Sequence, residues 1–214
     1  MLKKFTNVTV SFVGTVATSL ATMPAPSQAM PMGIMLPPKV IEEVQETKST
    51  KEVENKTPKE TKFVCKGCNA NEKRTVEFLQ QRGIKDRNAI ATIMGNIRQE
   101  STFHPNICEG GARVPYRACR SGGYGLIQWT NAPRYNGLGN FAAKIGGDPS
   151  SLDTQLQYKM YEQDWKMIEP YMMQPGKTIH QYMKLARKWI RWGHTGARVD
   201  YAYEYASKLV KVSS

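Results

Sequence analysis

The spacing of apolar residues predicts a mostly helical domain in the C-terminal part of the chain. Apolar side chains recur every three or four residues in two neighbouring segments, residues 71–83 and 86–101. Gly83 is a common helix stop, and Asp86 is a favourable N-cap for the second segment. Helix periods or helix boundaries also mark residues 133–147, 150–172, 178–193 and 197–212.

Residues 102–123 break this pattern. They are rich in Gly and Pro and contain Cys108 and Cys119, so they predict a loop, a hairpin or short strands. The expected fold class is therefore mainly α or α+β, with helices around one irregular segment that comes after the second helix.

The first 29 residues read as a secretory signal peptide. Lys3 and Lys4 precede a mildly apolar run, and small residues before Met30 suit cleavage after Ala29. The run is too short and too polar to favour an uncleaved membrane anchor, and no other stretch approaches transmembrane length. We therefore expect a secreted or periplasmic protein, without a stable membrane span, whose cysteines meet an oxidising compartment.

Residues 30–62 differ in composition from the C-terminal part of the chain. They are rich in Pro, Lys, Glu and Thr, lack aromatic residues, and balance six Lys against six Glu. Such a segment has little apolar surface to bury, so we expect a disordered polar linker, followed by a folded domain at 63–214.

The net charge of the chain is +12, and most of it belongs to the predicted domain. From Cys65 to Ser214, 22 Lys and Arg stand against 12 Asp and Glu, a net charge of +10. A basic exported domain is attracted to an anionic surface, whether a cell-wall polymer, lipid headgroups or extracellular nucleic acid. Charge alone does not choose among these partners.

The four cysteines favour disulfides over a metal or redox site. Cys65 and Cys68 form a C-x-x-C, but ten residues separate Cys108 from Cys119, which argues against zinc. The C-x-x-C also lacks the βαβ context of a thioredoxin-like motif. Cys108–Cys119 is the preferred pair, worth roughly 3 kcal/mol by loop closure, with Cys65–Cys68 left over and cross-pairing open. We expect no metal and no cofactor.

The stretch "GNIRQESTFHPN" places Glu100 where a helix runs into a loop. Glycosidic cleavage needs a carboxylic acid that keeps its proton, and a partly apolar wall raises the pKa to that end. The nearby apolar stretch of Leu126 and Ile127 suits this role, whereas the alternative is a solvated surface Glu. Arg98 would either hold Glu100 ionised or lie on the opposite helix face.

Two stretches in this order, "RQESTFHPN" and "GGYGLIQWTNAPR", resemble lysozyme-like glycan-cleaving domains. The pattern is similar to lytic transglycosylases and goose-type lysozymes, and more closely to phage tail-type lysozymes. The later "LDTQLQYKMYEQDW" and "TGARVDYAYEYASKL" also look like that family. The resemblance covers roughly Ala70 to Val212 and implies a lysozyme-like fold with helices around a cleft.

The resemblance implies a role for each matching residue. Glu100 matches the general acid and Ser101 the residue that orients it. The cleft wall that binds sugar would comprise Tyr124, Gly125, Gln128 and Trp129. The alternatives are that the two aromatic residues belong to the core and that the glycine serves a turn.

A second carboxylate is less well defined. Glu109, beside Cys108, is the nearest candidate for a group that acts across the sugar, and the alternative is a solvent-facing turn residue. Transglycosylases use one Glu and the sugar's own 6-hydroxyl. Their Ala-Tyr-Asn motif is not clearly present, which weighs against a standard transglycosylase.

We therefore expect a monomeric, exported peptidoglycan hydrolase that cleaves the β-1,4 bond between N-acetylmuramic acid and N-acetylglucosamine. Its partners would be glycan strands and the anionic wall surface, with no nucleic acid. One alternative is a lytic transglycosylase that releases 1,6-anhydro products, and another is a non-catalytic wall-binding or virion-associated module. A third is an envelope-active protein that acts through the basic helix "KLARKWIRWGHTGAR".

Overall fold

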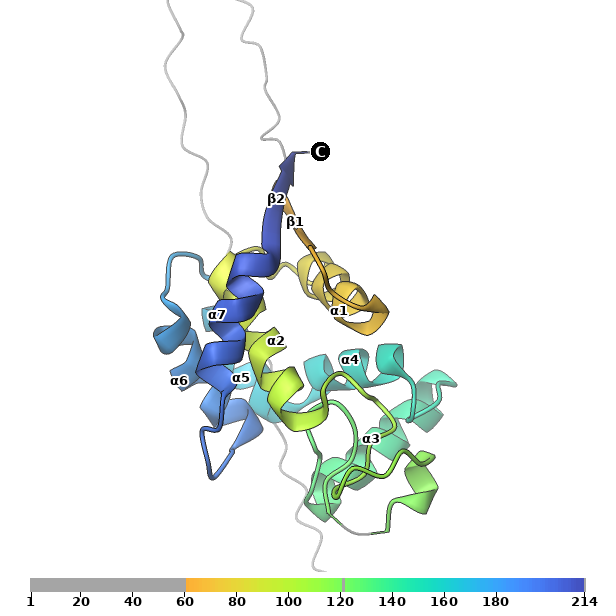
Figure 1. The fold of residues 1–214 in the computed structure, drawn as a ribbon. Helices are drawn as coiled ribbons and strands as arrows, with labels where there is room; N and C mark the ends of the chain where they lie inside the picture. Colours follow the sequence, from red (N-terminus) through yellow and green to blue (C-terminus); the bar gives the residue numbers. More distant parts are fainter. Residues whose placement is uncertain (1–60, 121, 214) are drawn as a thin grey trace, which may run out of the picture. The chain divides into compact units, whose positions relative to one another are not determined.

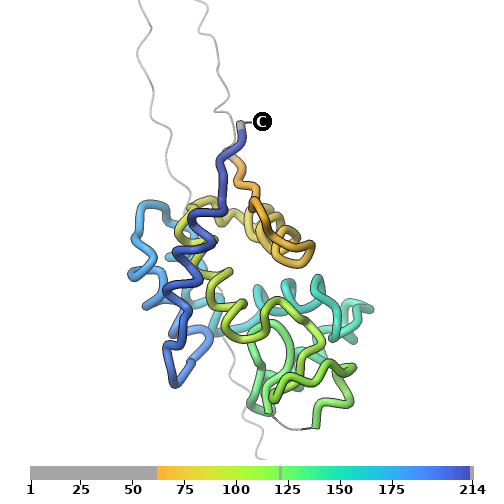
Figure 2. The backbone as a smooth tube through the Cα atoms, viewed as in Figure 1, coloured from red at the N-terminus to blue at the C-terminus, as the bar shows by residue number. Residues whose placement is uncertain are grey.

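A computed structural model describes residues 61–120 and 122–213, shown as a ribbon in Figure 1 and as a tube in Figure 2. The predicted mainly α fold is confirmed. The elements in chain order are β1 (Thr61–Cys65), α1 (Ala70–Gln81), α2 (Arg87–Ser101), the 3-10 turn η1 (Tyr116–Ala118), α3 (Ala132–Ile145), α4 (Leu152–Tyr161), α5 (Gln163–Met173), α6 (Ile179–Ile190), α7 (Arg198–Lys208) and β2 (Leu209–Ser213).

The predicted signal peptide and nearly all of the predicted linker lie outside the described residues. Strand β1 begins at Thr61, two residues before the expected start of the folded domain. None of the helices in the described part is long and apolar enough to span a membrane.

Local sequence signals set most helix boundaries. The carboxylate of Asp86 accepts hydrogen bonds from the backbone amides of Asn88 and Ala89 in the first turn of α2, as an N-cap should. The segment 150–172 forms two helices, because the backbone at Glu162 is extended and separates α4 from α5. The helix predicted at 197–212 ends at Lys208, so the prediction was wrong for the last residues, which belong to strand β2.

Strands β1 and β2 form a two-stranded antiparallel sheet, with Thr61 opposite Ser213 and Cys65 opposite Leu209. Figure 2 shows the orange start of the described chain beside its blue C-terminal end. The sheet therefore joins the two ends of the helical domain. The small strand pairing was not anticipated at these positions, because each strand is short and its partner is distant in sequence.

Helix α2 forms the centre of the core. Every residue from Ala89 to Ile97 is buried, and the helix packs closely against α7. The contact is tightest at Gly95, where a Cβ would lie 2.7 Å from the backbone nitrogen of Ala202 and from the carbonyl oxygen of Arg198. This close approach places the end of α2 beside the start of α7.

Candidate functional site

The irregular segment after α2 is held by a disulfide and two isolated β-bridges. Cys108 is bonded to Cys119, which confirms the preferred pair, and Cys65 is bonded to Cys68. The bridges pair Ile107 with Arg113 and Cys108 with Tyr124. The predicted loop or hairpin is thus a folded loop region that returns to the end of α2.

Helix α2 ends abruptly after Glu100 and Ser101. Thr102 and Phe103 both adopt left-handed backbone conformations, with φ of 47° and 61°, and the Phe103 side chain is buried. This turn reverses the chain direction at the helix end, since a left-handed residue cannot continue a right-handed helix. The carboxyl group of Glu100 is therefore presented at the helix terminus.

Ser101 ties the helix end to the stretch that contains Leu126. Its buried hydroxyl lies 2.9 Å from the carbonyl oxygen of Leu126 and 3.1 Å from that of Ile97. The serine was expected to orient the neighbouring acid. Both contacts are with backbone carbonyl groups, so the side chain of Ser101 holds the end of α2 against the segment that contains Leu126.

The turn at Gly125 is held by a glutamine that was not predicted as a site residue. The Gln155 side chain accepts a hydrogen bond from the amide of Leu126 and donates to two backbone carbonyls, including that of Pro105. Gly125 has φ of 74°, and a Cβ there would lie 2.5 Å from Oε1 of Gln155. Gly125 thus serves the turn and its close packing, and Gln155 falls within the family-like stretch "LDTQLQYKMYEQDW".

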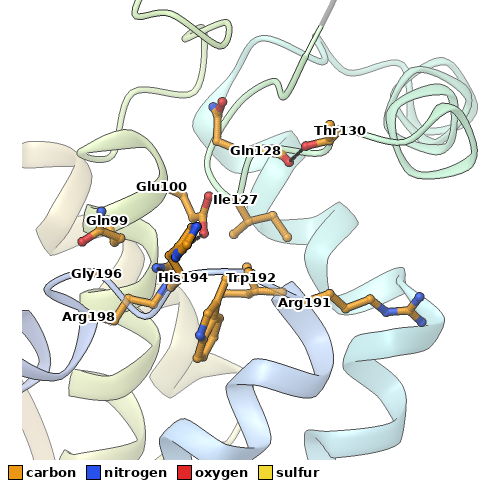
Figure 3. Close-up of a pocket in the computed structure, with 12 residues that line it drawn as sticks. Gln99, Glu100, Ile127, Gln128, Thr130, Arg191, Trp192, His194, Gly196 and Arg198 are labelled. Atoms are coloured by element: carbon orange, nitrogen blue, oxygen red, sulfur yellow. Dashed lines mark hydrogen bonds and ion pairs between the residues drawn. The ribbon is translucent and has the colours of Figure 1, made fainter.

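A pocket of about 440 Å³ opens at the end of α2 (Figure 3). Three segments line it: the helix end, the loop before α3, and the connection between α6 and α7. Its lining residues are Gln99, Glu100, Ile127, Gln128, Thr130, Ile190, Arg191, Trp192, Gly193, His194, Gly196 and Arg198. Glu100 is the single carboxylate among these residues.

Glu100 is largely buried and forms an ion pair with Arg198. The exposed fractions of the two side chains are 14% and 7%. Burial raises the pKa of Glu100 above its usual value, whereas the charges of Arg198 and Arg134 act in the opposite direction. The net shift is upward, so burial outweighs the attraction of the two guanidinium groups.

Arg198 is fixed by its own contacts as well as by Glu100. Its Nη1 donates to the carbonyl oxygens of His194 and Thr195, both at 2.8 Å. The guanidinium carbon lies 4.7 Å from the centre of the Trp192 ring. These contacts hold the connection between α6 and α7 against the pocket. Arg198 was not predicted, although it is the arginine of the family-like stretch "TGARVDYAYEYASKL".

Arg98 takes the second of its two expected positions. It pairs with Glu204 at 2.6 Å and lies over the ring of Tyr201, at 4.1 Å from the centroid. It does not contact Glu100 and is absent from the pocket lining. The cation that pairs with Glu100 therefore comes from α7, 98 positions further along the chain.

Of the expected sugar-binding residues, Gln128 is the one that lines the pocket. Its backbone is left-handed, with φ of 51°, and its Nε2 donates to the carbonyl of Gly125 at 3.0 Å. The half-buried amide is therefore held at the wall of the cavity. Thr130 hydrogen bonds to the backbone of Gln128 and adds a hydroxyl to the same wall.

Tyr124 and Trp129 lie in the core. Both side chains have an exposed fraction of 0%, and the Tyr124 hydroxyl is bonded to the carbonyl of Val114 and the hydroxyl of Ser150. Trp129 packs against Tyr158. Neither ring is accessible to a sugar, so the structure favours the core alternative for both aromatic residues.

Glu109 does not join Glu100 in the pocket. It is exposed, and its carboxylate accepts a hydrogen bond of 2.8 Å from the amide of Gly123. This contact stabilises the disulfide-bonded loop. The carboxylate expected to act across the sugar is therefore bound to the backbone of its own loop and does not line the pocket.

Comparison with known proteins assigns the chain to a family. The family model described as phage tail lysozyme matches residues 70–209, from the start of α1 to the start of β2. The chain is also 32% identical over 103 residues to morphogenesis protein 1 of Bacillus phage B103. That similarity covers 46% of this chain and 25% of the phage protein, so the chain spans about a quarter of that relative's length. This chain belongs to the phage tail lysozyme family.

Proposed function

We propose that the chain is an exported peptidoglycan hydrolase that cleaves the β-1,4 bond between N-acetylmuramic acid and N-acetylglucosamine. The observation that carries the proposal is a buried carboxyl with a raised pKa, Glu100, in a polar pocket of a lysozyme-family domain. An upward shift keeps a larger fraction of the group protonated near neutral pH, which a general acid requires.

In the proposed reaction, Glu100 gives its proton to the glycosidic oxygen as the bond to the sugar breaks. The carboxylate that forms is stabilised by Arg198, which already lies beside it. Water then adds to the sugar carbon and returns a proton to Glu100, which restores the starting state. Gln128 and Thr130 supply an amide and a hydroxyl that can hydrogen bond to sugar substituents.

A lytic transglycosylase reaction is the second candidate, and the pocket composition favours it specifically. Glu100 is the single carboxylate among the lining residues, and Glu109 is held elsewhere. A mechanism with one acid needs no second carboxylate if the sugar's own 6-hydroxyl attacks in place of water. The product is then a 1,6-anhydro sugar, which is lighter than the hydrolysis product by one water.

The envelope-active alternative has weaker support. Trp189 has an exposed fraction of 0% and packs edge-on against Trp165, with ring centroids 5.0 Å apart. The basic helix therefore keeps this tryptophan in the domain core, whereas an interfacial helix needs its apolar face free for the membrane.

Purified Glu100→Gln and the parent, incubated with peptidoglycan, test the proposal. The amide keeps the shape of the side chain but cannot donate the carboxyl proton, so release of soluble fragments should fall at least roughly 10²-fold. Glu109→Gln is the matched control and should keep its activity. Mass analysis of the parent's products separates reducing ends from anhydro ends. Full activity of Glu100→Gln would remove Glu100 as the acid, and an inactive parent that still binds walls would favour a non-catalytic module.

A further inference from the structure

The solvent-facing side of α6 carries a row of cations. Lys184, Arg187 and Lys188 are exposed, and Arg191 follows at the helix end. The spacing of three, four and seven residues puts these side chains on one face. The opposite face is buried against α2, α5 and α7, so the cationic face is a fixed part of the domain surface.

Most of this charge is uncompensated. Arg191 pairs with Asp164 at 2.6 Å. Within the described part of the chain, Lys184, Arg187 and Lys188 have neither a carboxylate within ion-pairing distance nor a side-chain hydrogen bond. Three cations on one exposed helix face repel one another, and an anionic ligand relieves that repulsion.

These residues line a groove beside the pocket that contains Glu100. The groove has a volume of about 540 Å³ and is lined by Lys184, Arg187, Lys188, Arg191 and Trp192. Arg191 and Trp192 also line the pocket that contains Glu100. Figure 3 shows Arg191 directed away from Glu100, with Trp192 on the pocket side. The groove and the pocket are thus neighbours that share one wall.

We propose that this groove, hereafter the α6 groove, binds the carboxylates of the stem peptides that a peptidoglycan strand carries. The inference rests on the proposed function and deepens it. The acidic groups of a peptide-bearing strand belong to its peptides, because its sugar rings have neutral hydroxyl and acetamido groups and the lactyl carboxyl group of each muramic acid is bound in the amide to the peptide. A strand seated at Glu100 carries its peptides into the surroundings of the pocket, where the α6 groove offers Lys and Arg for carboxylates. The half-buried Trp192 adds apolar surface for aliphatic peptide side chains.

Binding by a variant that cannot cleave its ligand tests the inference. The experiment compares Glu100→Gln with the same protein that also carries Lys184→Gln, Arg187→Gln and Lys188→Gln. One ligand is insoluble peptidoglycan freed of phosphate-containing polymers. The other is the same glycan after an amidase has removed its peptides and the lactyl carboxylates that this step exposes have been converted to amides. The groove variant should bind peptide-bearing strands roughly tenfold more weakly at low salt, and this difference should shrink in about 0.5 M salt. Both proteins should bind the stripped strands equally.

A charge-matched control variant separates the groove from net charge. Lys66→Gln, Lys73→Gln and Lys211→Gln remove three exposed cations near the β1–β2 sheet and α1, outside the α6 groove. This control should bind peptide-bearing strands as Glu100→Gln alone does. Circular dichroism of each variant checks that the fold is retained.

Three results would overturn the inference. The first is that the control variant loses as much binding affinity as the groove variant does, and the second is that the groove variant binds stripped strands as weakly as it binds peptide-bearing strands. The third is that the groove variant loses affinity only for walls that still carry phosphate polymers or for vesicles with anionic headgroups. Each of these leaves the cleavage result for Glu100 untouched. Conversely, loss of the proposed catalytic role would not alter a peptide-dependent binding defect, since the experiment uses a variant without the acid.

Discussion

The close packing of α2 on α7 makes Gly95→Ala the most informative structural perturbation. An added Cβ would lie 2.7 Å from the nitrogen of Ala202 and 2.7 Å from the carbonyl oxygen of Arg198. Ordinary van der Waals contact requires about 3.5 Å, so the helices must separate by roughly 0.8 Å. The contacted atoms belong to the backbone, so no side-chain rotation relieves the clash.

The expected loss of stability follows from two opposing effects. Overpacking of a tight core costs about 1–3 kcal/mol, and two backbone clashes place this site toward the upper end. Replacing glycine by alanine inside a helix returns about 1 kcal/mol. Gly95→Ala should therefore be destabilised by about 2 kcal/mol. Activity should also fall, by up to roughly 10²-fold, because Arg198 starts α7 and moves away from Glu100 when the helices separate.

Urea unfolding gives the stability change as a shift in midpoint, and fragment release from peptidoglycan gives the activity. Gly139→Ala is the matched control. Its added Cβ also meets an atom at 2.7 Å, but that atom is the side-chain hydroxyl of Tyr116, which can move. The loss of stability in Gly139→Ala should be smaller. If Gly95→Ala is as stable and active as the parent, the close approach of the two helices does not hold Arg198 beside Glu100.

Three further predictions concern the acid and its support. Arg198→Gln removes a charge that lowers the pKa of Glu100, so the alkaline limb of the pH profile of kcat/KM should move to higher pH. Arg98→Gln is the control and should leave this limb at the same pH, because Arg98 pairs with Glu204. Ser101→Ala leaves the buried carbonyl of Leu126 without its hydroxyl partner and should cost about 1–2 kcal/mol in denaturant unfolding; an unchanged midpoint would contradict this role. Because the folded state raises the pKa of Glu100, it binds that proton more tightly than the unfolded state does. Parent stability should therefore fall relative to Glu100→Gln as the pH rises through the folded-state pKa, and parallel stability curves would refute the upward shift.

The sequence predicted the position of Glu100 because the relevant signals are local. Asp86 marks the start of α2, the apolar period gives its buried face, and the Gly- and Pro-rich segment marks its end. A carboxylate at that boundary could be identified without any knowledge of tertiary contacts. The Cys108–Cys119 pair was also accessible, because both cysteines lie in one short loop of an expected oxidised protein.

The remaining parts of the site depend on contacts between distant residues, which leave no local pattern. Arg198 meets Glu100 across 98 positions, and Gln155 meets Leu126 across 29. Local spacing also cannot tell whether an aromatic residue such as Tyr124 faces a cleft or the core, because both sites favour large apolar rings. The structure decides in favour of the core through its burial and the hydrogen bonds of its hydroxyl.

The balance of forces on Glu100 explains why a buried acid would be paired with a buried cation. Burial and the negative end of the α2 dipole both disfavour the carboxylate, so both favour the protonated form of Glu100. Alone, these two effects would also oppose release of that proton to the glycosidic oxygen. Arg198 offsets part of this penalty, and its bonds to the carbonyls of His194 and Thr195 hold it in place whether or not Glu100 is charged. The carboxylate therefore forms beside a cation that does not have to reorganise, which lowers the barrier of the proposed proton transfer, while burial raises the pKa of the resting acid.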